Sequence, residues 1–220
     1  MNPFAKPCRF IAGIVRCIVL LAAVFLVAAC DSEPQERALP AGSKVLALGD
    51  SLTAGAGVTP EQSWPALLAS RTGWEVVNGG VSGDKSSDAL ERLPALLEEH
   101  QPVLVLVTLG GNDMLRHVPE PETVANLGQV LALVKEHGAK AVLLATPKPS
   151  LTGAVFQSLS PPEFYRQLSD EHQVPLIEDA IPEVLSDPQM KGDPLHPNVE
   201  GHALLSGKIF EALQAIGYVR

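Results

Sequence analysis

Cysteine is scarce in this chain, which excludes a fold held together by disulfides. Only three of the 220 residues are cysteines, and all of them (Cys8, Cys17 and Cys30) lie within the first 30 positions. The rest of the chain can therefore form no internal disulfide. A domain of this length buries enough apolar surface to fold without covalent cross-links.

Motifs for metal and nucleotide binding are also missing. The sequence has no His-Glu-x-x-His pair and no cluster of cysteines and histidines, so the common zinc signatures are absent. Gly55-Ala56-Gly57 is similar to part of a phosphate-binding loop, but no Gly-Lys-Ser/Thr follows it and the dinucleotide spacing is absent. We therefore expect no metal and no cofactor.

Positive charge is in the minority. The chain has 16 lysines and arginines against 25 aspartates and glutamates, which gives a formal net charge of −9. Such an acidic balance argues against nucleic acid as a partner. It also argues against electrostatic attraction to anionic lipid headgroups.

The N-terminal apolar stretch, Ile18–Ala29, is too short to span a membrane. It has 12 residues, whereas crossing a bilayer takes about 20. Positive charges precede it, and it ends in small residues followed by Cys30. This pattern resembles the signal of bacterial lipoproteins, in which the cysteine is lipidated and becomes the new N-terminus. The alternative is a short membrane anchor in which Cys30 is an ordinary buried cysteine.

The lipoprotein resemblance sets the domain boundaries that we expect. Residues 1–29 are a lipoprotein signal peptide, residues 30–43 a flexible tether with two prolines, and residues 44–220 the folded domain. Removal of the signal takes away Lys6, Arg9 and Arg16 and no acidic residue, so the formal charge changes from −9 to −12. The resemblance implies a lipid-anchored protein of the bacterial cell envelope that faces the periplasm, on the inner or the outer membrane.

From Lys44 onward, short apolar runs alternate with amphipathic stretches. Strands are expected at Val45–Leu48, Glu75–Val77, Val103–Thr108, Ala141–Ala145 and Leu176–Ile177. Helices are expected at Ser63–Ser70, Ser87–His100, Glu122–His137, Pro161–Glu171 and Val199–Ile216, with Pro94 as a kink or boundary in the second. Strict alternation of strand and helix predicts an α/β fold, with a parallel sheet covered by helices on both faces.

Three polar motifs follow the first three expected strands. They begin at Gly49 (Gly-Asp-Ser-Leu), at Gly80 (Gly-Val-Ser-Gly-Asp) and at Gly110 (Gly-Gly-Asn-Asp). Because ligands of open parallel sheets bind outside the carboxyl ends of the strands, all three motifs are expected at one edge. This convergence predicts a binding or catalytic site there.

A serine needs a base before it can act as a nucleophile. Ser51 lies at the tip of the first strand, and among the six histidines His196 stands apart, in a proline-flanked loop three residues after Asp193. That spacing allows the carboxylate to reach the imidazole and fix its tautomer. We therefore expect Ser51, His196 and Asp193 to work together. An α/β-hydrolase is disfavoured, because Gly-Asp-Ser-Leu lacks the second glycine of a nucleophile elbow.

An attacked carbonyl becomes an oxyanion, which requires hydrogen-bond donors already in place. Gly80 and Gly83 allow backbone N–H groups to approach a ligand closely, and Asn112 adds a side-chain amide. Asn78-Gly79 is expected to be only a turn.

These blocks, with the Asp-Pro-Leu-His-Pro-Asn run that begins at Asp193, resemble the SGNH hydrolases, also called GDSL esterases and lipases. The match spans roughly Lys44–Ile216 and is most similar to the thioesterase–lysophospholipase and arylesterase branch. It implies a flavodoxin-like three-layer sandwich with five parallel strands in the order 2-1-3-4-5. It also implies Ser51 as nucleophile, His196 as base and Asp193 as its orienter. The implied oxyanion donors are the N–H groups of Ser51 and Gly83 and the Asn112 side chain.

Two departures from the family pattern concern the loops. Pro194 stands where relatives often carry glycine, and the segment from Pro147 to Pro161, which shapes the acyl pocket in this branch, matches poorly. The expected function is hydrolysis of carboxylic esters through an acyl-serine. The expected partners are a small-molecule or lipid ester and the membrane, through the lipid on Cys30, and the protein is expected to be a monomer. The alternatives are an O-acetylesterase of envelope polysaccharide and a non-catalytic binding lipoprotein on the same fold.

Overall fold

The computed structural model describes residues 36–149 and 158–220. The expected signal peptide and Cys30 lie outside these residues, as does most of the segment from Pro147 to Pro161. Among the helices of the described residues, none combines the length and apolar character that a membrane span requires.

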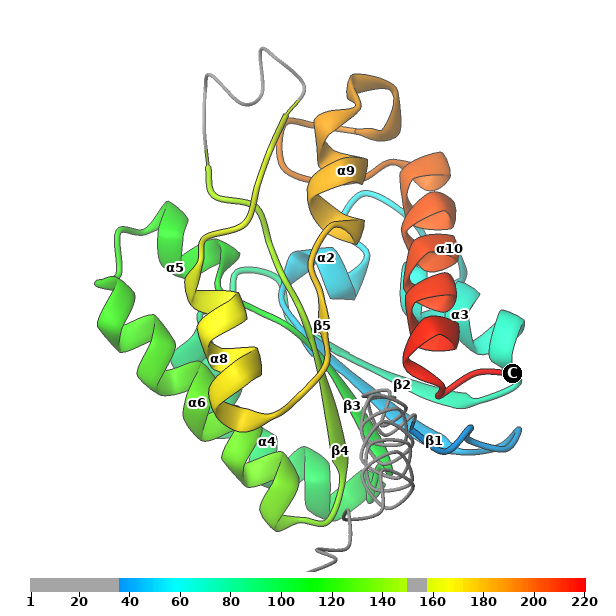
Figure 1. Ribbon diagram of the computed structural model, residues 1–220. Helices are drawn as coiled ribbons and strands as arrows, with labels where there is room; N and C mark the ends of the chain where they lie inside the picture. The colour runs from blue at the N-terminus through cyan, green and yellow to red at the C-terminus, as the bar shows by residue number, and fades with distance from the viewer. Residues whose placement is uncertain (1–35, 150–157) are drawn as a thin grey trace, which may run out of the picture. The chain divides into compact units, whose positions relative to one another are not determined.

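Five parallel strands form the centre of the unit that begins at Glu36 (Figure 1). They are β1 (Lys44–Gly49), β2 (Glu75–Gly80), β3 (Leu104–Thr108), β4 (Lys140–Leu144) and β5 (Leu176–Ile177). Their order is β2-β1-β3-β4-β5, which confirms the expected topology. The register pairs Leu46 with both Val77 and Val105, so β1 lies between β2 and β3.

Helices cover both faces of this sheet, as predicted. On one face lie α3 (Trp64–Thr72), α9 (Ala180–Ser186) and α10 (Val199–Ile216), and on the other α4 (Ser86–His100), α6 (Glu120–Glu136) and α8 (Phe164–His172) (Figure 1). Successive residues of a strand point to opposite faces. Val45 and Ala47 of β1 accordingly pack toward α10, whereas Leu46 and Leu48 pack toward α4 and α6.

Helix α4 continues through Pro94, so this proline is not a helix boundary. Proline inside a helix removes one hydrogen bond and leaves a carbonyl without its partner. Pro94 lies on the exposed side of α4, where water can bind the free carbonyl. Leu93 and Leu97 are buried and anchor the helix on both sides of it.

The Asn78-Gly79 pair was predicted to be a turn, and this prediction is wrong. Both residues belong to β2, where Asn78 pairs with Ala47. The Asn78 side chain donates a hydrogen bond to the carbonyl of Thr53 (2.9 Å). At Gly80, a Cβ atom would lie 2.2 Å from the backbone nitrogen of Ala54. The glycine therefore allows the chain after β1 to lie directly against β2.

Several short helices were not predicted. They are α2 (Ser51–Ala54), α5 (Gly111–Leu115), α9 and the 3-10 turns η1 (Pro60–Gln62) and η2 (Pro188–Met190). Helices α2 and α5 directly follow β1 and β3, so their first residues lie at the carboxyl edge of the sheet (Figure 1).

The folded unit also begins earlier than the boundary expected at Lys44. The backbone N–H of Glu36 donates to the carbonyl of Ile216, and that of Leu39 donates to the carbonyl of Tyr218. The Leu39 side chain packs against the core on the α10 side. The chain from Glu36 is thus held beside the C-terminal residues, and the compact unit extends to Arg220.

Candidate active site

Ser51 is the first residue of α2. Strand β1 ends at Gly49, and a single residue, the N-cap of α2, lies between the strand and Ser51. The cap is Asp50, whose carboxylate oxygen Oδ1 accepts a hydrogen bond from the backbone N–H of Leu52 (2.9 Å). Such an aspartate satisfies one of the free N–H groups at a helix start. The helix ends after one turn at Gly55, in the left-handed region (φ +85°). Strand, cap and short helix together fix Ser51 at the sheet edge.

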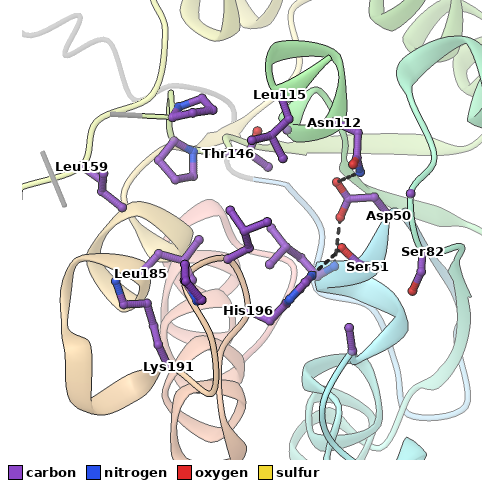
Figure 2. A pocket seen from close by; sticks show the side chains of 18 of the residues that line it. Asp50, Ser51, Ser82, Asn112, Leu115, Thr146, Leu159, Leu185, Lys191 and His196 are labelled. Carbon is purple, nitrogen blue, oxygen red and sulfur yellow. Dashed lines mark hydrogen bonds between the residues drawn. The ribbon is translucent and has the colours of Figure 1, made fainter. Parts of the chain in front are cut away.

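His196 approaches Ser51 from a loop 145 residues away in the sequence (Figure 2), and Asp193 lies on the same loop. The ring atom Nε2 of His196 lies 2.9 Å from Oγ of Ser51, and Nδ1 lies 2.8 Å from Oδ2 of Asp193. A carboxylate only accepts hydrogen bonds, so Nδ1 carries the ring proton. The lone pair of Nε2 then faces the serine hydroxyl, which is the tautomer that a base requires.

The loop that carries the histidine is fixed at both ends. Asn198 caps α10 by accepting a hydrogen bond from Gly201 N–H (2.8 Å), and its amide donates to the carbonyl of Gln189 (2.7 Å). Lys191 and Pro197 form an antiparallel bridge. Within the loop, Oδ1 of Asp193 accepts from two backbone N–H groups, those of Leu195 (2.7 Å) and His196 (2.9 Å). The carboxylate is therefore oriented before any ligand binds.

The expected oxyanion donors lie around the same cavity. Gly83 has a positive φ of +88°, which a residue with a side chain adopts only with strain. Ser51, Gly83 and Asn112 all line the cavity. Asn112 is in the first turn of α5, and its amide nitrogen donates a hydrogen bond to Oδ2 of Asp50 (3.1 Å).

Two ionic side chains, Arg92 and Asp113, hold these loops in position through hydrogen bonds. Arg92 of α4 donates to Oδ2 of Asp84 (2.7 Å) and to the carbonyl of Gly49 (3.0 Å). It thereby ties the loop that holds Gly83 to the end of β1. Asp113 is buried next to Asn112 and accepts hydrogen bonds from the backbone N–H (2.9 Å) and hydroxyl (2.5 Å) of Ser86. These contacts hold the second and third motif loops together.

Burial and hydrogen bonding shift the pKa values of two carboxyl groups at the site in opposite directions. Burial raises the pKa of Asp50 to about 6, against the lowering effects of the Leu52 N–H, the charge of His196 and the Asn112 amide. The hydrogen bond from the His196 ring, with that from Leu195 N–H, holds the pKa of Asp193 below its usual range. Asp193 therefore stays charged at neutral pH, and its side chain is 51% exposed to water, which also favours the charged form.

His202 is a buried histidine that belongs to the framework. Burial, followed by the charge of His196, lowers its pKa to about 4. Its Nδ1 accepts a hydrogen bond from the backbone N–H of Trp64 (3.3 Å), which joins α10 to the start of α3. His202 is therefore neutral at physiological pH and leaves His196 as the base nearest to Ser51 among the residues that the structure describes.

A cavity of about 650 Å³ opens at Ser51. Its walls are mainly apolar, and in Figure 2 Leu159 and Leu185 lie on one side of it and Ser82 on the other. Pro147, Lys148 and Pro149 also line it, so the described ends of the poorly matched segment from Pro147 to Pro161 contribute to the wall. The described residues contain no group of histidines, cysteines and carboxylates suited to a metal ion.

The structure thus brings together every expected site residue that it describes. It also adds residues that sequence reasoning missed, chiefly Asp50 and Arg92. Gly110 does not line the cavity: a Cβ atom there would collide with the hydroxyl of Tyr165, which hydrogen-bonds to the carbonyl of Leu109 (2.6 Å) and to Thr146 (2.6 Å). Gly111 lines the cavity instead.

A serine, a histidine and an aspartate in one hydrogen-bonded chain, at the carboxyl edge of a flavodoxin-like sheet, define a serine hydrolase. Comparison with known sequences gives the family. The chain belongs to the GDSL-like lipase/acylhydrolase family, whose sequence model matches residues 47–204. The resemblance seen in the four sequence blocks is therefore confirmed.

Similar proteins of known activity are enzymes. The chain is 36% identical over 179 residues to an arylesterase of Vibrio mimicus, covering 79% of this chain and 89% of the relative. It is 38% identical over 181 residues to thioesterase 1/protease 1/lysophospholipase L1 of Escherichia coli, covering 80% and 86%. Among solved structures, the psychrotrophic esterase EstA from Pseudoalteromonas sp., inhibited by monoethylphosphonate, matches with a TM-score of 0.68 and 26% identity. That match covers 79% of this chain and 97% of EstA.

Proposed function

We propose that the protein hydrolyses carboxylic esters through an acyl-serine intermediate formed on Ser51. The observation that carries the proposal is the continuous chain from Oγ of Ser51 through the His196 ring to Asp193, at the mouth of an apolar cavity. A hydroxyl in contact with an oriented base is the arrangement that activates serine.

The reaction follows from the positions of these groups. Oγ of Ser51 attacks the carbonyl carbon while Nε2 of His196 takes the hydroxyl proton, and the carbonyl electrons move onto the oxygen. The N–H groups of Ser51 and Gly83 and the Asn112 amide receive that oxyanion. When the C–O bond to the alcohol breaks, Nε2 donates its proton to the departing oxygen. Water then attacks the acyl group in the same way, and Ser51 regains its proton as the acid leaves.

The cavity supports esters with an apolar acyl chain as substrates. Its volume of about 650 Å³ far exceeds the space that an acetyl group fills. An aryl or lipid ester, as in the names of the two relatives, therefore fits better than an O-acetylated polysaccharide. Two lysines in the wall, Lys148 and Lys191, form no ion pair with any residue that the structure describes. Their charges favour a substrate that also carries a phosphate.

The proposed location is the cell envelope. Removal of residues 1–29 and lipidation of Cys30 would anchor the enzyme on the periplasmic side of a membrane, and we propose that it works there as a monomer. In that position it meets lipid esters rather than cytoplasmic acyl-CoA. Labelling with radioactive palmitate, with and without Cys30→Ala, tests the anchor: the label is expected on the native protein and absent from the variant.

A panel of esters tests the substrate class. We expect kcat/KM to rise from acetyl to octanoyl p-nitrophenyl esters by at least about tenfold, since each buried CH2 contributes roughly 0.8 kcal/mol. A lysophospholipid is expected to be cleaved faster than the monoacylglycerol with the same acyl chain. Maximal activity on acetyl esters would instead support the O-acetylesterase alternative.

Replacing Asn112 by alanine tests the oxyanion hole. The loss of one preorganised donor is expected to lower kcat about 100-fold, with little change in KM, because the donor acts on the charge that develops during the reaction. Steady-state kinetics on a p-nitrophenyl ester measure both constants. A change in KM alone would remove Asn112 from the oxyanion hole.

A further inference from the structure

Asp50 is a buried carboxylate to which the proposed reaction assigns no step. Its side chain lies between two elements: Oδ1 accepts from the Leu52 N–H of α2, and Oδ2 accepts from the Asn112 amide of α5 (Figure 2). The residue is only 2% exposed. It makes no ion pair with any arginine, lysine or histidine among the described residues.

Capping of α2 does not by itself require a carboxylate. Serine, threonine and asparagine cap helices about as well as aspartate, and they carry no charge. Burying an unpaired carboxylate is costly, and burial accordingly raises the pKa of Asp50 to about 6. A neutral residue would cap α2 at a lower cost. The charge therefore has a second purpose, and the group in contact with it is Asn112.

The contact fixes which way the Asn112 amide points. An amide has an NH2 end that donates and an oxygen that accepts, and a rotation of about 180° exchanges them. A carboxylate accepts only, so it holds the NH2 end and repels the oxygen. One amide hydrogen is used by Oδ2 of Asp50. The second hydrogen is free to donate into the cavity that Asn112 lines.

We propose that Asp50 is a positioning residue for the oxyanion hole: it holds the Asn112 amide with its free N–H toward the substrate carbonyl, and it acts on the reaction only through Asn112. This inference rests on the proposed esterase function. The proposed role links the first motif to the third, because Asp50, the residue before Ser51, sets the orientation of the Asn112 amide on a different loop.

The test is a double-mutant cycle with Asp50→Asn and Asn112→Ala. Asparagine can still accept from Leu52 N–H, but it then presents an NH2 group to Asn112, and this donor favours the reversed amide with its oxygen toward position 50. Asp50→Asn alone is expected to lower kcat by about tenfold with little change in KM, as for the loss of one hydrogen bond to a charged group. In the Asn112→Ala background, Asp50→Asn is expected to change kcat by less than about twofold, since the residue it positions is gone.

Two further variants separate this role from a structural one. Asp187 caps η2 and accepts from Gln189 N–H (2.8 Å), with the same spacing as Asp50 and Leu52. Asp187→Asn is therefore the matched control and is expected to keep wild-type kcat. Asp50→Ser retains a capping hydroxyl for α2 but cannot reach Asn112, so it is expected to behave as Asp50→Asn in both backgrounds. Asp50→Ser also serves as the test variant if Asp50→Asn does not fold.

The outcomes distinguish the inference from the function on which it rests. Equal losses from the Asp50 variants with and without Asn112 would overturn the inference, because Asp50 would then act through Ser51 or α2. Unchanged kcat in both Asp50 variants would overturn it as well. In either case the esterase assignment stands as long as Ser51→Ala is inactive.

Discussion

Replacing Ser51 by alanine is expected to lower kcat by at least about 10³-fold, as removal of a covalent nucleophile does in other serine hydrolases. The variant removes one oxygen atom, the one that lies 2.9 Å from Nε2 of His196. The oxyanion donors and the cavity remain, so the residual rate measures what they contribute without covalent catalysis. Hydrolysis of a p-nitrophenyl ester gives the rate directly.

Two controls show that this loss is chemical. Ser51 follows the cap and contributes no side chain to the buried core, so thermal unfolding of Ser51→Ala is expected to match that of the native protein. Ser82 also lines the cavity, and Ser82→Ala is expected to remain active and to react with a fluorophosphonate, whereas Ser51→Ala is not. Wild-type turnover by Ser51→Ala would refute the mechanism. A native protein that neither hydrolyses esters nor reacts with the fluorophosphonate would favour the binding-lipoprotein alternative.

The parallel sheet was predictable because its inner strands β1, β3 and β4 are buried, whereas the order of the strands was implied by the family resemblance. A continuous apolar run such as Leu104–Val107 identifies a buried strand, and regular alternation with amphipathic helices implies parallel pairing. The short helices were not predictable. Helix α2 has four residues and α5 has five, too few for helical periodicity to show. Asn78-Gly79 carries a turn signal that pairing with β1 overrides.

The main residues of the site were predictable from the sequence. The contacts that hold those residues in position, such as that between Asp50 and Asn112, were not. Topology alone places the motif serine and Asn112 at one edge, because both follow parallel strands. Local spacing then relates Asp193 to His196. The contact between Asp50 and Asn112 joins positions 62 residues apart and depends on a side-chain distance that no sequence pattern contains. An aspartate directly before the expected nucleophile was the available signal, and by itself it does not indicate a contact with Asn112.

The second large effect that we predict is the loss of kcat on replacing Asp193 by asparagine, and the exposure of Asp193 limits the size of that loss. Asp193→Asn retains Oδ1, so the hydrogen bonds from Leu195 and His196 N–H persist and the loop keeps its shape. The new NH2 group replaces Oδ2 and donates to Nδ1 of His196, which moves the ring proton to Nε2, where it faces Ser51. In a buried triad this wrong tautomer costs about 10⁴-fold in kcat.

Here water reaches the carboxylate, whose side chain is 51% exposed, and can support the correct tautomer for part of the time. We therefore expect Asp193→Asn to lower kcat by about 10³-fold, less than the buried case. Asp187→Asn, at a helix cap that does not line the cavity, is the control for the substitution itself. A loss below about threefold would mean that the exposed carboxylate fixes the loop and not the tautomer. Since Asp193 Oδ2 is the atom that contacts the ring, such a result would make the backbone bonds of Oδ1 its main contribution.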